Sequence, residues 1–171
     1  KVRKFLFWAE RLGMKYSDYL ISDSIGIQDY LQAKYNVNST FIPYGADVFN
    51  DPNPLILQKY NLEEYSYDIL IARLEPENSI LIILDGVVLA KTKRPFIVIG
   101  NHETKYGENL KNRYKKYLDI KFIGGVYDIY IINNIRYYSN VYFHGHTVGG
   151  TNPSLLEAMA SYSLICANNN P

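Results

Sequence analysis

The chain has 171 residues, of which 47% are apolar and 20% charged, and its net charge is +1. This length can bury one sizeable core, and this apolar content excludes an intrinsically disordered chain. The small net charge gives no reason to expect a nucleic-acid partner. Cys166 is the single cysteine, no apolar run reaches membrane-spanning length and no signal peptide is visible. We therefore expect no internal disulfide and a cytoplasmic location.

The first segment, Lys1–Tyr16, has the periodicity of an amphipathic helix, with Phe5, Trp8 and Leu12 on one stripe. Its basic start, KVRK, is typical of a solvated helix face, although it could also contact an anionic membrane surface. Because the chain begins inside this pattern without an initiator Met, we expect it to be part of a larger protein.

A strand–helix–strand unit follows the first helix. The pattern predicts strands at Tyr19–Ser22 and Thr40–Pro43 around a helix at Ile27–Tyr35, which either Asp23 or Ser24 could cap. Residues 51–67 are polar and marked by prolines, so they are predicted to form an interdomain linker with some local helix.

From Asp68 onward, strands and helices alternate strictly, which predicts a doubly wound parallel sheet of the α/β class with right-handed crossovers. The predicted strands are Asp68–Ala72, Pro95–Gly100, Ile120–Ile123, Val141–His144 and Ser163–Ala167. The predicted helices are Ser79–Ala90, Glu108–Leu118, Asp128–Tyr138 and Pro153–Ser161.

In the usual strand order of such a sheet, the first and fourth of these strands lie side by side. The order of the strands reverses between these two, and this reversal opens a crevice at their carboxyl ends. The loops Arg73–Asn78 and Gly145–Asn152 should share that crevice. Arg73 could grip a diphosphate with its guanidinium, or it could instead pair with Glu75 or Glu77 on the surface.

The second of these loops has the residues of an anion-binding turn. Gly149 and Gly150 can adopt positive φ, so that successive N–H groups converge. Asn152 is a natural N-cap and Pro153 suits the first helical position. The helix then directs its positive end toward the turn, where a phosphate is the expected ligand. The same residue types also occur at junctions that only connect a strand to a helix.

The two histidines at the end of the fourth strand, His144 and His146, should face one side. His102 is the only other histidine, and a catalytic zinc site needs three protein ligands. We therefore expect no metal, and expect this pair to shape the pocket or to contact a sugar.

The run HGHTVGGTNPSLLEAMA, together with ARLEPEN, IVIGN and IKFIGGVYD, resembles the retaining glycosyltransferases of family 4, which have the GT-B fold. The longer run is most similar to their bacterial rhamnosyltransferase branch. The resemblance implies that residues 1–50 end an acceptor-side domain, that 51–67 link the domains, and that 68–171 form a truncated donor-binding domain.

The resemblance also implies roles for individual residues. Arg73 would contact the donor diphosphate, with Asn78 at a position that is commonly lysine. The donor diphosphate would also contact Gly149, Gly150 and Thr151, and Gly149 stands where the family commonly has a glutamate near the sugar. Asn152, His144 and His146 would then line the sugar pocket, and the departing diphosphate would need no metal.

Glu157 matches the glutamate that holds the ribose hydroxyls in that family. On the residues alone, Ser154 and Glu157 could instead form a capping box, in which Glu157 only holds the helix start. We favour the phasing with Asn152 as cap, because proline is well placed directly after it and Glu157 is then free for a ligand.

These expectations together describe a glycosyltransferase that moves a sugar from a nucleotide-diphosphate donor to a glycan or lipid-linked acceptor in bacterial surface polysaccharide synthesis. Similar enzymes retain anomeric configuration and use no cofactor. The full-length enzyme could associate with the inner face of the membrane, and this chain alone should not transfer sugar. The alternatives are a non-catalytic nucleotide-sugar-binding module, or a nucleotide-sugar epimerase or hydrolase.

Overall fold

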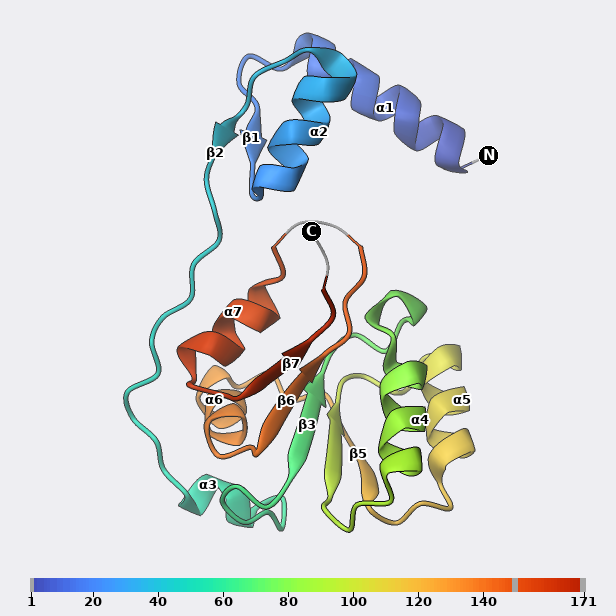
Figure 1. Cartoon of the computed structure of the whole chain (residues 1–171), viewed down its shortest axis with the longest axis vertical. Helices are drawn as coiled ribbons and strands as arrows, with labels where there is room; N and C mark the ends of the chain where they lie inside the picture. Colours follow the sequence, from blue (N-terminus) through green and yellow to red (C-terminus); the bar gives the residue numbers. More distant parts are fainter. Residues whose placement is uncertain (1, 149–150, 170–171) are drawn as a thin grey trace. The chain divides into compact units, whose positions relative to one another are not determined.

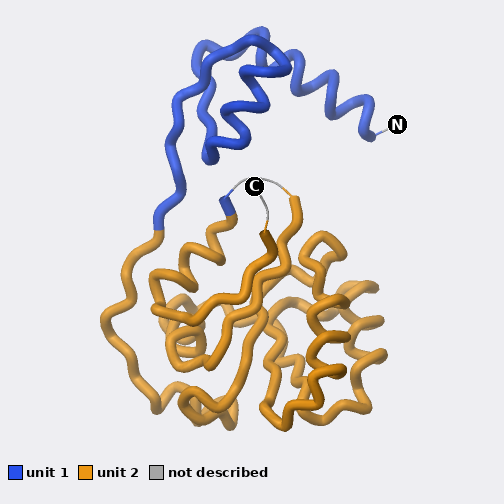
Figure 2. The backbone as a smooth tube through the Cα atoms, viewed as in Figure 1, with its two compact units in different colours: residues 1–45, 149–151, 171 blue, residues 46–148, 152–170 orange. Residues whose placement is uncertain are grey.

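The computed structural model describes residues 2–148 and 151–169. Within them the backbone forms two compact units, one made mainly of the residues up to Gly45 and the other of residues 46–148 and 152–169 (Figure 2). Of the helices in these ranges, none combines the length and the apolar character that crossing a bilayer requires.

The first unit contains two helices and a pair of short parallel strands. Its elements are α1 (Val2–Tyr16), β1 (Ile21–Ser22), α2 (Ile25–Tyr35) and β2 (Thr40–Phe41). Ser24 caps α2, since its hydroxyl accepts from the N–H of Ile27, which decides between the two predicted caps. Lys34 of α2 pairs with Glu10 of α1 at 3.0 Å and ties the helices together.

The second unit is a five-stranded parallel sheet with helices on both faces (Figure 1). Its strands are β3 (Asp68–Ile71), β4 (Phe96–Ile99), β5 (Ile120–Gly124), β6 (Val141–His144) and β7 (Ile165–Ala167). Its helices are α3 (Leu55–Gln58), the short 3₁₀ helix η1 (Pro76–Asn78), α4 (Ile80–Ala90), α5 (Lys105–Tyr114), α6 (Ile129–Tyr137) and α7 (Pro153–Ala160). The strand order is β5-β4-β3-β6-β7, so the predicted doubly wound sheet and the adjacency of its first and fourth strands are confirmed.

Alternation along the central strands divides the core into two layers. Ile69, Ile97 and Tyr142 pack on one face with α3, α6 and α7. Leu70 and Val98 pack on the other face with α4 and α5. Both faces are therefore covered, which is the usual condition for an all-parallel sheet.

The stretch 51–67, predicted to be a linker with local helix, does contain the short helix α3. Leu57 is only 2% exposed and Leu62 only 8%, and both belong to the core layer beneath α6. Tyr67 at the end of the stretch is 0% exposed and belongs to the same layer. The stretch therefore packs as part of the second unit, anchored by these three buried side chains.

Four helix starts differ from the prediction. Helix α2 begins at Ile25 rather than Ile27, and helix α6 begins at Ile129, with the predicted first residue Asp128 as its N-cap. Helix α5 begins at Lys105 rather than Glu108, because the Thr104 hydroxyl caps it by accepting from the N–H of Gly107. Helix α4 begins at Ile80, after the 3₁₀ helix η1 and a left-handed Ser79 with φ of 49°. The loop between β3 and α4 therefore contains a regular 3₁₀ turn of its own.

Candidate functional site

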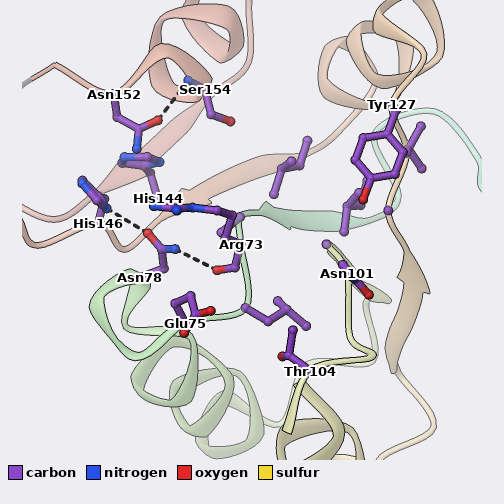
Figure 3. A pocket seen from close by; sticks show the side chains of 17 residues that line it. Arg73, Glu75, Asn78, Asn101, Thr104, Tyr127, His144, His146, Asn152 and Ser154 are labelled. Atoms are coloured by element: carbon purple, nitrogen blue, oxygen red, sulfur yellow. Dashed lines mark hydrogen bonds between the residues drawn. The ribbon is translucent and has the colours of Figure 1, made fainter. Parts of the chain in front are cut away.

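A cavity of about 480 Å³ opens at the carboxyl ends of the central strands (Figure 3). It lies at the switch point between β3 and β6, where ligands of open α/β sheets bind. Residues from the loops after β3, β4, β5 and β6 line it. Five of the predicted site residues do so: Arg73, Asn78, His144, His146 and Asn152.

Two glycines let the neighbouring loops lie directly against the loop after β3. A Cβ on Gly145 would lie 2.4 Å from the carbonyl oxygen of Asn78, and a Cβ on Gly100 would lie 2.2 Å from that of Ala72. Both distances are far inside van der Waals contact, so only glycine permits this backbone approach. Of these two glycines, Gly100 lines the cavity itself.

Arg73 lies two residues after the end of β3 and is exposed. Its side chain points toward the side of the cavity where His144 and His146 lie (Figure 3). Within the described ranges Arg73 forms no ion pair, so the alternative pairing with Glu75 or Glu77 is not formed. The guanidinium is therefore available to an anion in the cavity.

Asn78, predicted as a diphosphate contact, is 6% exposed and already engaged within the protein. Its Nδ2 donates to the carbonyl oxygen of Arg73 at 2.8 Å. Its Oδ1 lies 2.9 Å from Nδ1 of His146, which must be the donor because an amide oxygen can only accept. Asn78 thus joins the loops after β3 and β6, and its position adds no positive charge.

His144 and His146 face the same side, as predicted, with ring centroids 6.2 Å apart. The His144 ring stacks on Tyr142 at an interplanar angle of 17°. Burial, and then the neighbouring His146, lowers the pKa of His144, so that its neutral form is favoured. The described residues contain no cluster of three or more His, Cys, Asp or Glu side chains that could hold a metal ion.

The start of α7 has the favoured phasing. Asn152 is the N-cap, with its Oδ1 accepting from the N–H of Ser154 at 2.9 Å, and Pro153 occupies the first helical position. Asn152 and Ser154 line the cavity, so the positive end of the helix borders it. Thr151 directly precedes the cap and is half-buried. Gly149 and Gly150, the other predicted phosphate contacts, lie outside the described residues.

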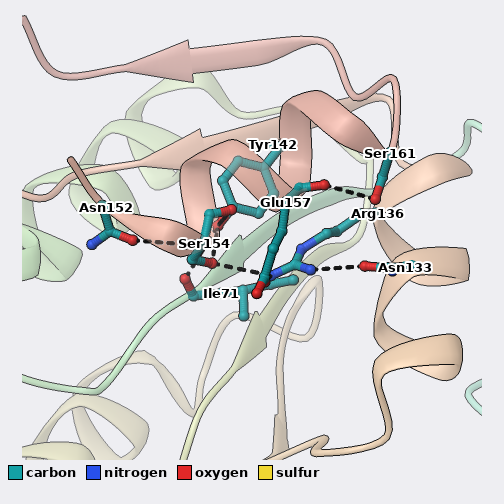
Figure 4. A network of polar contacts seen from close by, with 8 residues as sticks. All are labelled: Ile71, Asn133, Arg136, Tyr142, Asn152, Ser154, Glu157 and Ser161. Carbon is teal, nitrogen blue, oxygen red and sulfur yellow. Dashed lines mark hydrogen bonds and ion pairs between the residues drawn. The ribbon is translucent and has the colours of Figure 1, made fainter. Parts of the chain in front are cut away.

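The sequence suggested that Glu157 has no partner within the protein. In the structure it forms an ion pair with Arg136 of α6 (Figure 4). Sequence analysis missed Arg136, which is 1% exposed. The available signal was its place four residues after Ile132, on the apolar stripe of the helix. A charged residue on such a stripe needs a buried partner, and α7 supplies it.

The loops after β4 and β5 also line the cavity, although the residue pattern pointed only to the two loops at the switch point. These loops contribute Asn101, Thr104 and Tyr127 to the cavity wall opposite α7 (Figure 3). Asn101 and Tyr127 are exposed, so this wall is open to solvent.

Comparisons by sequence say little about the chain. The family described as "Domain of unknown function (DUF1972)" matches residues 1–47. A comparison with curated protein sequences finds no match.

Comparisons by structure are more informative. HepE of Anabaena, in complex with UDP and glucose, has a TM-score of 0.80 at 19% identity, over 96% of this chain and 48% of that one. A glycosyltransferase from Rickettsia africae has a TM-score of 0.76 at 15% identity, over 92% of this chain and 48% of that one. Sucrose-phosphate synthase of Thermosynechococcus elongatus has a TM-score of 0.75 at 19% identity, over 94% of this chain and 43% of that one.

The chain therefore spans about half the length of the solved structures that it matches. They are GT-B glycosyltransferases. This chain has the fold of part of a GT-B glycosyltransferase, as the strand order, the helix layers and the extent of the match all indicate.

Proposed function

We propose that the chain is the donor-binding part of a glycosyltransferase that takes a sugar from a nucleotide-diphosphate donor and passes it to a glycan or lipid-linked acceptor. One observation carries the proposal. Arg73, the positive end of α7 and the pair His144 and His146 all border one cavity at the β3/β6 switch point. Such a convergence of cationic and N–H groups suits a diphosphate.

The chemistry that this arrangement serves is the departure of the diphosphate. Cleavage of the sugar–phosphate bond places negative charge on the leaving diphosphate. A helix N-terminus and a fixed guanidinium stabilise that charge without having to reorganise during the reaction. We propose that Arg73 and α7, with Gly149, Gly150 and Thr151, do this without a metal ion, and that the transfer retains anomeric configuration.

His144, His146 and Asn152 line the same cavity and would contact the donor sugar. Glu157, one turn beyond the cavity-lining Ser154, would hold the ribose, as the resemblance to family 4 implies. UDP is the first donor nucleotide to test, since the HepE structure holds UDP and glucose. A deoxysugar such as rhamnose would suit the resemblance to rhamnosyltransferases and the glycine at position 149. A role in surface polysaccharide synthesis at the inner face of the membrane completes the proposal.

A non-catalytic nucleotide-sugar-binding module is the second candidate. The observation that favours it is Asn78, which replaces a common lysine and whose amide is engaged with Arg73 and His146. A site with one cation fewer could bind a donor and yet release its sugar slowly. An epimerase or hydrolase on this fold would differ in its products.

The binding proposal is tested by thermal unfolding with UDP, GDP, ADP, dTDP and inorganic pyrophosphate, each with and without EDTA. A ligand at a hundred times its dissociation constant stabilises by about 2.7 kcal/mol. We expect one nucleoside diphosphate to stabilise the chain more than pyrophosphate does, with EDTA making no difference. If no nucleotide stabilises it, the donor-site assignment is wrong, and loss of binding in EDTA would refute the metal-free site.

The catalytic proposal is tested on the full-length protein by analysing products from the nucleotide sugar that binds. A lengthened acceptor indicates transfer, free sugar indicates hydrolysis, and an altered donor sugar indicates an epimerase. An unchanged donor with tight binding would support the module instead.

A further inference from the structure

Arg136 is a fully charged side chain in the core of the second unit. It is 1% exposed, and its guanidinium carries five N–H donors that need partners in the core. Its Nη2 donates to Oε2 of Glu157 at 2.5 Å and to Oγ of Ser154 at 3.1 Å, while Nη1 donates to Oδ1 of Asn133 at 2.9 Å (Figure 4). The buried charge is thus directed at the first two turns of α7.

The two partners of this ion pair differ in exposure. The Arg136 side chain is 2% exposed, whereas that of Glu157 is 36% exposed. Only Oε2 of Glu157 is held, and Oε1 has no hydrogen-bond partner among the described residues. The carboxylate is therefore anchored from the inside by one oxygen and open to a ligand with the other.

The same guanidinium also fixes a residue of the cavity wall. Ser154 lines the cavity, and its Oγ lies between Nη2 of Arg136 and the hydroxyl of Tyr142, which is 2.8 Å away. Arg136 thus joins the cavity wall to the Glu157 carboxylate.

Stability alone is a weak reason for this arrangement. Replacing a buried ion pair by apolar side chains of similar volume is often neutral or stabilising. In addition, Nε of Arg136 is buried without a hydrogen-bond partner in the part of the chain that the structure describes. A buried donor without a partner lowers the stability of the fold. The guanidinium is therefore oriented to favour its Nη contacts rather than to satisfy all of its N–H groups.

We propose that Arg136 is a positioning residue for the donor nucleotide, which holds the Glu157 carboxylate in the orientation that accepts the two ribose hydroxyls. The inference rests on the proposed function, because it assumes that a nucleoside diphosphate occupies the cavity. Without the ion pair, Glu157 has to be ordered at the moment of binding, and long side chains lose much rotamer freedom when they are ordered.

The test compares UDP with 2′,3′-dideoxyuridine diphosphate, which lacks both ribose hydroxyls, by isothermal titration calorimetry. We expect the wild-type chain to prefer UDP by about tenfold or more, the effect of a lost charge-assisted hydrogen bond. Arg136→Met should remove most of this preference while leaving the affinity for the dideoxy compound within about threefold. If Arg136 had a purely structural role, Arg136→Met would weaken the binding of UDP and of the dideoxy compound by the same factor.

The control is Arg113→Met, which breaks an exposed ion pair with Asp85 on α4 and should leave the preference unchanged. If Arg136→Met does not fold, Arg136→Lys takes its place in the test. Lysine keeps the charge but lacks the planar fork of the guanidinium, so this variant should also lower the preference for UDP. In a Glu157→Gln background, a further Arg136→Met change should have no additional effect on the preference.

Two outcomes would overturn the inference and are distinguishable. If UDP binds and both Arg136 variants keep the wild-type preference, Arg136 does not position Glu157. If neither UDP nor its dideoxy analogue binds the wild-type chain, the proposed donor site itself fails.

Discussion

Asn78 is the residue whose replacement tests the architecture of the cavity most directly. It makes two hydrogen bonds, to the carbonyl oxygen of Arg73 at 2.8 Å and from Nδ1 of His146 at 2.9 Å, and is 6% exposed. Each such bond contributes about 0.5–1.5 kcal/mol net, so Asn78→Ala should lower the free energy of unfolding by about 1–3 kcal/mol. For a chain of this size that corresponds to a fall in melting temperature of about 2–12 °C.

The assay is thermal and urea unfolding of the wild type and Asn78→Ala, with Asn101→Ala as the matched control. Asn101 also lines the cavity, but it is exposed and makes a single local hydrogen bond, its Oδ1 accepting from the N–H of Glu103. Its replacement should therefore lower the free energy of unfolding by less than Asn78→Ala does, by about 0.5 kcal/mol. Since Asn78 holds the Arg73 loop, Asn78→Ala should also weaken UDP binding, though less than removal of Arg73 itself does. Wild-type stability in Asn78→Ala would show that the bridge between the loops contributes nothing.

Three further predictions concern the same cavity. Arg73→Ala should weaken UDP binding by about 1.5–3 kcal/mol without changing the binding of uridine, and equal losses measured by calorimetry for both ligands would place Arg73 away from the diphosphate. Gly145→Ala should lower the melting temperature and UDP affinity together, because its Cβ would lie 2.4 Å from the Asn78 carbonyl oxygen; unchanged values would mean that the loops can separate freely. The lowered pKa of His144 means that the unfolded chain binds this proton more readily, so its contribution to stability is present above its ordinary pKa of 6.5 and is lost as the pH falls below it. His144→Gln should therefore reduce the loss of melting temperature between about pH 7.5 and about pH 5, and an identical loss in both proteins would contradict the assignment.

The sheet and the place of the cavity could be predicted from the residue pattern alone. The alternation of strands and helices after Asp68 predicted a doubly wound sheet, because parallel strands joined by right-handed crossovers have few other arrangements. That order put the loops containing Arg73 and His146 at one switch point, where the structure also has them. The start of α7 could also be predicted from the sequence. Asn152 and Pro153 set it, and capping depends only on neighbouring residues.

The hydrogen bonds and ion pairs of the polar side chains could not be predicted from the residue pattern. Asn78 and His146 are 68 positions apart in the chain, and Arg136 and Glu157 are 21 apart. Side-chain contacts across such separations depend on how helices and loops pack against the sheet, and residue patterns do not specify the rotamers that bring two atoms within hydrogen-bonding distance. Glu157 therefore looked free in the sequence, whereas in the folded chain it neutralises a buried arginine.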